Sequence, residues 1–391
     1  MGTRFRFLAG VALPALLFCL TACSNSTSST TSGTGALFVA ALGDSSISSF
    51  SIDLTTGLLT ANGGTTPTGG TPSAMFLAPT GTELFVANSG TNNISAYTVK
   101  SDGTLTAASG TTATGMTPLA LSMDAAGKFL FVANQGLQVN PTSGTVSVFG
   151  VQGTTLTEVP GSPFVVTGLS PASGPGPAGL AVTPDGKYLY VAGQFDGTLT
   201  KFSVNASGAL TQGPISSVGT APSAVTITPD GGFVYVANSS TVSAFGVCNQ
   251  VVTTCSDPNS PDGSLTTVAG SPFSAGIAPV AMLVAPSGKF LFVVNRQSNQ
   301  ISEFKVATGT GVLTANAQPS ISTGSNPVGI TLRAGTTTIT ATGGITDYLY
   351  VPNLGASSIS VYSFDSTVGT LGLVGGPVPV TSGQPSAVAA E

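Results

Sequence analysis

A short apolar motif recurs seven times along this chain of 391 residues and limits the folds that the chain can adopt. Each copy contains Leu or Val, an aromatic residue and Val in succession. Neighbouring copies lie about 45 to 60 residues apart, a spacing typical of the blades of a β-propeller. The copies are LFVAA (37–41), LFVAN (84–88), LFVAN (130–134), LYVAG (189–193), VYVAN (234–238), LFVVN (291–295) and LYVPN (349–353).

Each copy lies within a predicted unit of four β-strands. A proline-led segment of small residues precedes it, as in APSAVTITPDGG (221–232). Small side chains suit the crowded innermost strand of a blade, and the PDGG sequence suits a type I turn. An alternating strand such as NISAYTV (93–99) follows, and then a Thr-rich outer strand such as GTLTAAS (103–109). We predict an all-β fold, a seven-bladed β-propeller of four-stranded blades over residues 35–391.

The two ends of the predicted propeller complement each other. The first motif, at 37–41, has no proline-led strand before it, whereas the chain finishes with such a segment, QPSAVAAE (384–391). We expect this last strand to pair beside residues 37–41 and close the ring onto the first blade. Closure removes the exposed sheet edges that promote aggregation.

The first 22 residues are typical of a signal peptide. Arg4 and Arg6 precede an apolar stretch, residues 7–20, that is too short to span a bilayer comfortably. The LTAC sequence ending at Cys23 resembles the lipobox of bacterial lipoproteins, and the resemblance implies that Cys23 is lipidated. The alternative is an ordinary signal peptide cleaved at a small-residue site.

Residues 23–34 are rich in Ser, Thr and Gly and are predicted to be a flexible tether. We therefore expect an exported lipoprotein of the bacterial cell envelope, on its periplasmic or surface side, that contacts the membrane only through its lipid anchor. Cys248 and Cys255 remain as a pair once Cys19 leaves with the signal peptide and Cys23 is lipidated. A disulfide is predicted between them. The alternative, a redox or metal pair, lacks further thiols and histidines to complete a site.

Charged residues make up only 6% of the chain, and neither His nor Trp is present. The commonest general base and the commonest metal ligand are therefore both missing. Acidic residues outnumber basic ones by 15 to 10, which disfavours nucleic acid as a partner. We expect no cofactor, no bound metal and a monomeric protein.

The repeated motif and the turn before it resemble those of the YVTN and lactonase-like seven-bladed propellers. This resemblance covers nearly everything after the tether. It implies either a sugar-lactone hydrolase related to 6-phosphogluconolactonase or a non-enzymatic surface propeller. These are different functional classes, and the fold alone does not choose between them.

An enzyme would need an activated water and a group that stabilises the developing oxyanion. The loops expected at the ligand-facing mouth contain three charged residues, Asp44, Asp196 and Arg296, each on a different blade. These are the catalytic candidates if the protein is an enzyme. A phosphorylated sugar would meet one arginine where several cations are expected. The charge pattern therefore disfavours the lactonase.

The same loops are rich in amides and hydroxyls, which suit the recognition of a protein or glycan by many uncharged hydrogen bonds. The alternative for the repeated Asn is structural, because an Asn that ends a strand also starts a turn. We predict a non-catalytic binding or scaffolding module, with a lactonase-like hydrolase as the alternative. Its predicted binding residues are Asn88, Asn134, Gln194, Asp196, Asn295 and Arg296.

Overall fold

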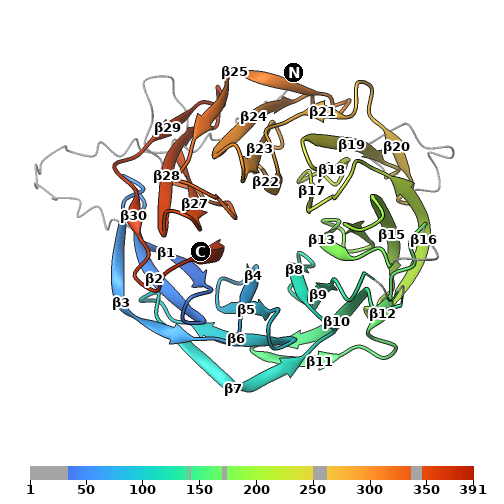
Figure 1. The fold of residues 1–391 in the computed structure, drawn as a ribbon, viewed down its shortest axis with the longest axis horizontal. Coiled ribbons are helices and arrows are strands. Elements are labelled where there is room, and N and C mark those ends of the chain that lie inside the picture. Colours follow the sequence, from blue (N-terminus) through green and yellow to red (C-terminus); the bar gives the residue numbers. More distant parts are fainter. Residues whose placement is uncertain (1–33, 139, 141, 170–173, 250–261, 336–345) are drawn as a thin grey trace, which may run out of the picture. The chain divides into compact units, whose positions relative to one another are not determined.

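The computed structural model describes residues 34–138, 140, 142–169, 174–249, 262–335 and 346–391. The predicted signal peptide and almost all of the tether lie outside these residues and remain predictions. None of the described residues forms a helix long and apolar enough to cross a membrane. Within the described part of the chain the strands form seven antiparallel sheets, arranged as blades around a central axis (Figure 1). The predicted seven-bladed propeller is confirmed.

Four blades consist of four strands each, ordered from the axis outward. Blade 1 contains β31 (Pro385–Ala390), β1 (Thr34–Ala41), β2 (Ser46–Asp53) and β3 (Leu59–Pro67). Blade 2 contains β4 (Pro72–Leu77), β5 (Glu83–Asn88), β6 (Asn93–Val99) and β7 (Leu105–Ala113). Blade 4 contains β13 (Pro177–Val182), β14 (Tyr188–Gly193), β15 (Thr198–Val204) and β16 (Leu210–Ser217). Blade 6 contains β22 (Pro279–Val284), β23 (Phe290–Asn295), β24 (Gln300–Val306) and β25 (Leu313–Ser322).

In the other three blades the outer strand is split into two pieces. Blade 3 contains β8 (Pro118–Met123), β9 (Phe129–Asn134), β10 (Thr145–Gln152), β11 (Thr155–Glu158) and β12 (Phe164–Val165). Blade 5 contains β17 (Ala224–Ile227), β18 (Phe233–Ala237), β19 (Thr241–Val247), β20 (Leu265–Thr267) and β21 (Phe273–Ser274). Blade 7 contains β26 (Thr331–Arg333), β27 (Thr346–Asn353), β28 (Ser358–Asp365), β29 (Leu371–Leu373) and β30 (Val378–Pro379).

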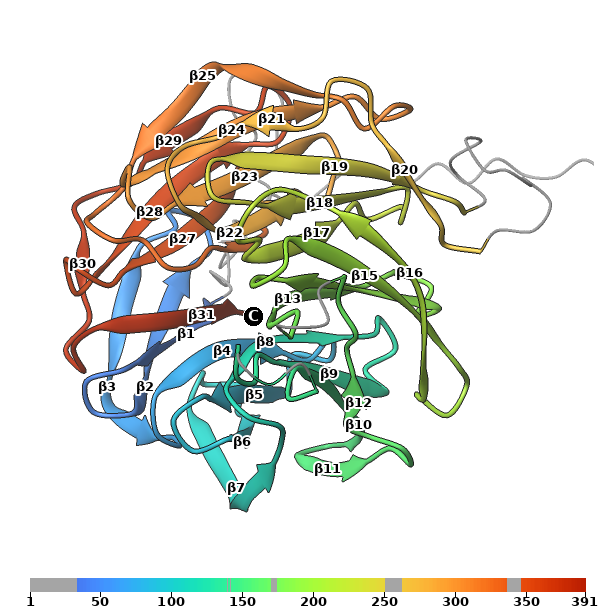
Figure 2. The ribbon, with the colours of Figure 1, turned by 45° about the vertical axis from the view of Figure 1, so that its right-hand side comes forward.

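The ring is closed by the end of the chain, as predicted. Strand β31 pairs antiparallel with β1, and Val388 lies opposite Val39. The amide of Glu391 continues this pairing with a hydrogen bond of 2.9 Å to the carbonyl oxygen of Ala36. Figure 2 shows β31 beside β1, with the C-terminus near the axis. Blade 1 therefore takes its inner strand from the opposite end of the chain from its other three strands.

The core lies between adjacent blades, because the second strand of each blade buries both of its faces. Phe85, Phe131 and Phe292 occupy the same place in this strand in three blades and are fully buried. Between blades 6 and 7, Phe292 and Phe364 pack edge to face with ring centroids 5.0 Å apart. This continuous burial explains why the repeated motif reads as an apolar run rather than an alternating one.

Cys248 is buried directly after β19, at the end of the third strand of blade 5. Cys255 lies outside the described residues, as does Cys23. The disulfide and the lipid anchor therefore remain predictions.

Candidate functional site

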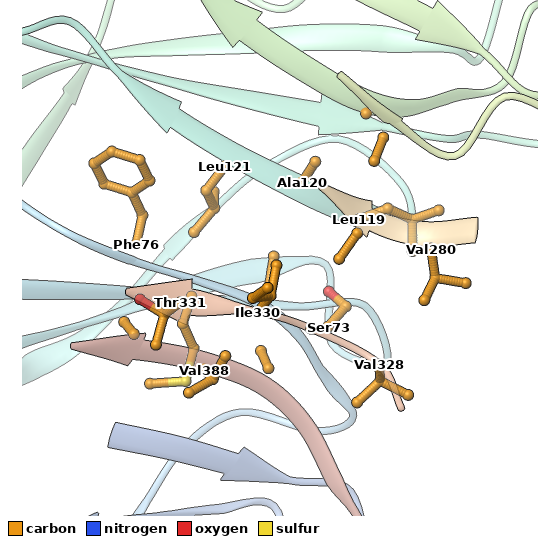
Figure 3. Close-up of a pocket in the computed structure, with 18 of the residues that line it drawn as sticks. Ser73, Phe76, Leu119, Ala120, Leu121, Val280, Val328, Ile330, Thr331 and Val388 are labelled. Carbon is orange, nitrogen blue, oxygen red and sulfur yellow. The ribbon is translucent and has the colours of Figure 1, made fainter. Parts of the chain in front are cut away.

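The seven inner strands surround a cavity of about 440 Å³ on the axis of the propeller. Its wall consists mainly of small and aliphatic residues from every blade, including Leu121, Val280, Ile330 and Val388, together with Phe76 (Figure 3). Among the described residues, no charged side chain lines it. Each inner strand pairs on one side only, so its free edge adds backbone amide and carbonyl groups to this wall.

The hydroxyl groups in the wall are Ser73, Ser223, Thr331 and Ser386. Two of them connect neighbouring blades: Ser73 Oγ donates to the carbonyl oxygen of Pro118 at 2.6 Å, and Ser223 Oγ to that of Pro279 at 2.7 Å. The cavity is therefore neutral, and its polar groups come mainly from the backbone.

We define the mouth as the rim of the propeller formed by the turns from second to third strands and by the connections from one blade to the next inner strand. The repeated Asn ends the second strand at this rim in four blades, at Asn88, Asn134, Asn295 and Asn353, and directly follows it in blade 5, at Asn238. None of these side chains is accessible beyond 1%. The predicted binding residues Asn88, Asn134 and Asn295 therefore present no surface to a ligand.

Asn295 shows what these buried amides do. Its Nδ2 donates to Ser302 Oγ on the third strand at 2.9 Å, and its Oδ1 accepts from the backbone amide of Gly276 at 3.0 Å. Gly276 lies in the connection from the preceding blade, so one amide links three segments of backbone. A Cβ at Gly276 would lie 2.5 Å from Asn295 Cγ, so the approach requires glycine. Asn295 thus has a structural role, although through a bond to the next strand and not through a turn.

Blade 4 has Gly193 in place of this Asn, and Asp196 occupies the space of the missing side chain. Asp196 Oδ1 accepts from Thr198 Oγ1 at 2.6 Å, and Oδ2 accepts from the backbone amide of Leu169 at 3.1 Å. A Cβ on Gly168 would overlap Asp196 Oδ2. Gly168 therefore has the same role as Gly276: because it has no side chain, the backbone can approach a polar side chain closely, Asp196 in blade 4 and Asn295 in blade 6.

The replacement of the Asn by Gly193 leaves one polar atom of blade 4 without its usual partner. Thr200 corresponds to the serine that bonds the Asn in other blades, and its Oγ1 is buried without a hydrogen-bond partner among the described residues. Blade 1 follows a related pattern, because Ala41 replaces the Asn and Asp44 stands three positions later. Asp44 Oδ1 accepts from Ser46 Oγ at 2.6 Å. The two acids of the mouth therefore lie in the two blades in which the repeated motif lacks its Asn. The sequence contains this correlation, but the spacing of the motifs alone did not reveal it.

The structure places Asp44, Asp196 and Arg296 on the mouth but in blades 1, 4 and 6, so it does not gather them into one cluster. Asp196 is half-buried, whereas Asp44 and Arg296 are exposed. The Arg296 guanidinium forms no ion pair with any described residue. Gln194 accepts a hydrogen bond of 2.6 Å from Gln135 Nε2, which joins blades 3 and 4 at the mouth. Ligand contact by Gln194, Asp196 and Arg296 remains a prediction.

Two charged side chains are buried between blades, at equivalent places in the third strands. Lys201 donates to the carbonyl oxygen of Asp262 in blade 5. Glu303 is 1% exposed, and its Oε2 accepts from Asn316 Nδ2 at 3.3 Å, while Oε1 has no partner among the described residues. Burial raises the pKa of Glu303 to about 7. Neither side chain lines the axial cavity.

The part of the chain that the structure describes contains no cluster suited to a metal ion. No group of three or more His, Cys, Asp or Glu side chains there is close enough together to hold one. The groups that the described mouth and cavity do offer to a ligand are carboxylates, one arginine, uncharged side chains and backbone amides and carbonyls.

Solved structures of similar shape share the whole propeller. A candidate 6-phosphogluconolactonase from Bacteroides fragilis superposes with a TM-score of 0.71 at 23% identity, covering 93% of this chain and 99% of that one. The periplasmic gluconolactonase PpgL of Pseudomonas aeruginosa gives a TM-score of 0.70 at 22% identity, covering 91% of this chain and 99% of that one. At these identities the likeness establishes the fold. No curated protein matches the sequence.

A family model provides the stronger link. The model described as "Lactonase, 7-bladed beta-propeller" matches three overlapping segments, residues 56–157, 138–251 and 219–332. Together with the structural neighbours, this match contradicts the prediction of a non-catalytic binding or scaffolding module and favours its lactonase-like alternative. Because the matched segments cover well over half of its length, this chain belongs to the lactonase family of seven-bladed β-propellers.

Proposed function

We propose that this protein is a lactone hydrolase that binds its substrate where the axial cavity opens at the mouth. The observation that carries the proposal is the cavity itself. At about 440 Å³ it falls within the range of about 300–1,000 Å³ that is usual for small-molecule sites. Membership of the lactonase family supports hydrolysis of a lactone over other reactions of a small molecule.

Ring opening requires a base that takes a proton from water and a group that stabilises the oxyanion on the lactone carbonyl. The chain has no histidine, and a carboxylate is the base that the mouth offers. Asp196 is the better candidate, because it is half-buried and held by Thr198 and the Leu169 amide, whereas Asp44 is exposed. Arg296 supplies a positive charge at the mouth, and the free edges of the inner strands supply backbone N–H donors.

The test is Asp196→Asn, assayed by the opening of glucono-1,5-lactone followed in a pH-stat. Asn keeps an oxygen for the Leu169 amide, and its NH2 group can donate to the Thr198 hydroxyl, which also accepts hydrogen bonds, so the fold is retained while the base is lost. We expect kcat to fall by about 10²-fold or more with little change in Tm, as for the loss of a general base. Asp44→Asn is the matched control at the equivalent place in blade 1. A wild-type protein that opens no lactone faster than buffer contradicts the proposal.

We further propose that the hydrolase works in the bacterial cell envelope, anchored through Cys23 and carrying a Cys248–Cys255 disulfide. The lipobox-like LTAC sequence and the shortage of other cysteines support this location. Mass spectrometry of the membrane fraction tests both points. A diacylglycerol adduct on Cys23 and a disulfide-linked peptide pair are expected. Release of the protein as a soluble species that begins at an unmodified Cys23 contradicts the anchor.

A further inference from the structure

The basic residues of the propeller are distributed unevenly between its two rims. Eight Lys and Arg residues follow residue 22, against 15 Asp and Glu. Lys100, Lys128, Lys187 and Lys289 lie in turns of the rim opposite the mouth, and Lys305 and Arg333 lie at the strand ends of that rim. Lys201 is buried between blades 4 and 5. Of these eight basic residues, only Arg296 lies at the mouth.

A phosphorylated substrate is poorly matched to such a mouth. A phosphate dianion is usually held by several cationic side chains, often through bidentate Arg contacts. At this mouth it would meet one exposed arginine, the two carboxylates Asp44 and Asp196, and the field of a net negative protein. The cavity below adds no charge, since every described side chain in its wall is neutral.

We infer that the substrate is an uncharged, unphosphorylated sugar lactone. This inference rests on the proposed hydrolase function and specifies its substrate class. Backbone amides and carbonyls along the free edges of the inner strands hydrogen-bond the hydroxyls of such a ring without requiring charge. Aliphatic residues such as Val280 and Ile330 contact its C–H faces.

A cationic cleft lies elsewhere on the molecule, away from the axis. Lys289 and Lys305 line a space of about 480 Å³ between blades 6 and 7 on the rim opposite the mouth, together with Thr308 and Thr367. If phosphorylated lactones reacted at this protein, this cleft is where their phosphate would find two cations. The variant pair Lys289→Gln and Lys305→Gln therefore reports on that alternative.

The experiment compares kcat/KM for glucono-1,5-lactone and 6-phosphoglucono-1,5-lactone with the full-length propeller. We expect kcat/KM to be about 10²-fold or more higher for the neutral lactone. Each tenfold difference in kcat/KM requires only a modest difference in the free energy of binding the two transition states. We also expect its kcat/KM to change less than about twofold between low and high salt, because no charge on the substrate needs steering.

The two proposals fail in different ways. Equal or faster opening of the phosphorylated lactone overturns the substrate inference and leaves the hydrolase intact. So does a loss in the two Lys→Gln variants that is confined to the phosphorylated lactone. Absence of any rate above buffer with both lactones, and no difference from Asp196→Asn, overturns the hydrolase and with it the inference.

Discussion

Tyr350 Oη donates a hydrogen bond of 3.1 Å to the carbonyl oxygen of Gly57, a residue 293 positions earlier in the chain. Tyr350 lies in the second strand of blade 7, and Gly57 lies in the turn between the third and fourth strands of blade 1. Tyr235 makes the same bond to Gly311 between blades 5 and 6, at 3.0 Å. The junction between the last blade and the first is thus built like an ordinary junction between consecutive blades.

Tyr350→Phe is expected to lower the free energy of unfolding by about 1–3 kcal/mol, because it leaves the buried carbonyl of Gly57 without its donor. Burial raises the pKa of the Tyr350 hydroxyl, so the group stays protonated and donates at any working pH. Urea denaturation measures the change. Tyr235→Phe is the matched control and should lower the free energy of unfolding by a similar amount. If Tyr350→Phe has a negligible effect while Tyr235→Phe is destabilising, the ring closes without this bond.

Removing residues 384–391 is expected to destabilise the protein by far more than any single substitution. The truncation takes away β31, which exposes the edge of β1 and uncovers buried residues such as Val39. Thermal melting and protease resistance of the truncated chain test this. Adding the peptide QPSAVAAE should restore part of the lost Tm, and an unchanged melting curve without the peptide would contradict the closure.

Glu303 makes stability fall as the pH rises. Its folded pKa of about 7 lies above the ordinary value of 4.5, so between these two values the folded protein keeps a proton that the unfolded chain has released. The free energy of unfolding should drop by about 2–3 kcal/mol from pH 4.5 to pH 7.5 on this account. Glu303→Gln should flatten this dependence and raise stability at pH 8.

Urea titrations at pH 5 and pH 8 measure the effect. Glu158→Gln, on the exposed outer strand β11, controls for the loss of one negative charge without burial. An equal response of the two variants would mean that burial of Glu303 does not set the pH dependence.

The replacement of Asn by Asp196 in blade 4 predicts non-additive effects at positions 193 and 196. Gly193→Asn alone should be destabilising, since a Cβ there would lie 2.6 Å from Asp196 Oδ1. In the Asp196→Gly background the new Asn gains the vacated space and the unpaired Thr200 hydroxyl. We expect a coupling of about 1–3 kcal/mol in a double-mutant cycle by denaturation. Additive effects would show that the two side chains do not share one place.

The sequence alone determined the blades and the closure of the ring, because both depend on short patterns of neighbouring residues. A proline-led run of small residues can be an inner strand wherever it occurs, and the tail at 384–391 carried that signature without a partner nearby. The lactonase-like alternative was also within reach of the sequence. The match to the lactonase family model contradicts the preference for a binding module. The amides at 88, 134 and 295, which that preference used as contact groups, are buried.

The tertiary structure alone decided which polar side chains of the mouth are buried and already hydrogen-bonded. Asn295 is saturated by Gly276 from the preceding blade and by Ser302 from the next strand, and no spacing rule places those three groups together. The same holds for Asp196, whose partner amide at Leu169 comes from the connection between blades 3 and 4. It holds also for Glu303, whose partner Asn316 donates to the Gly369 carbonyl oxygen of blade 7 as well. Contacts between blades join residues that are distant in sequence, so local pattern fixes each strand while packing between blades fixes the chemistry of each side chain.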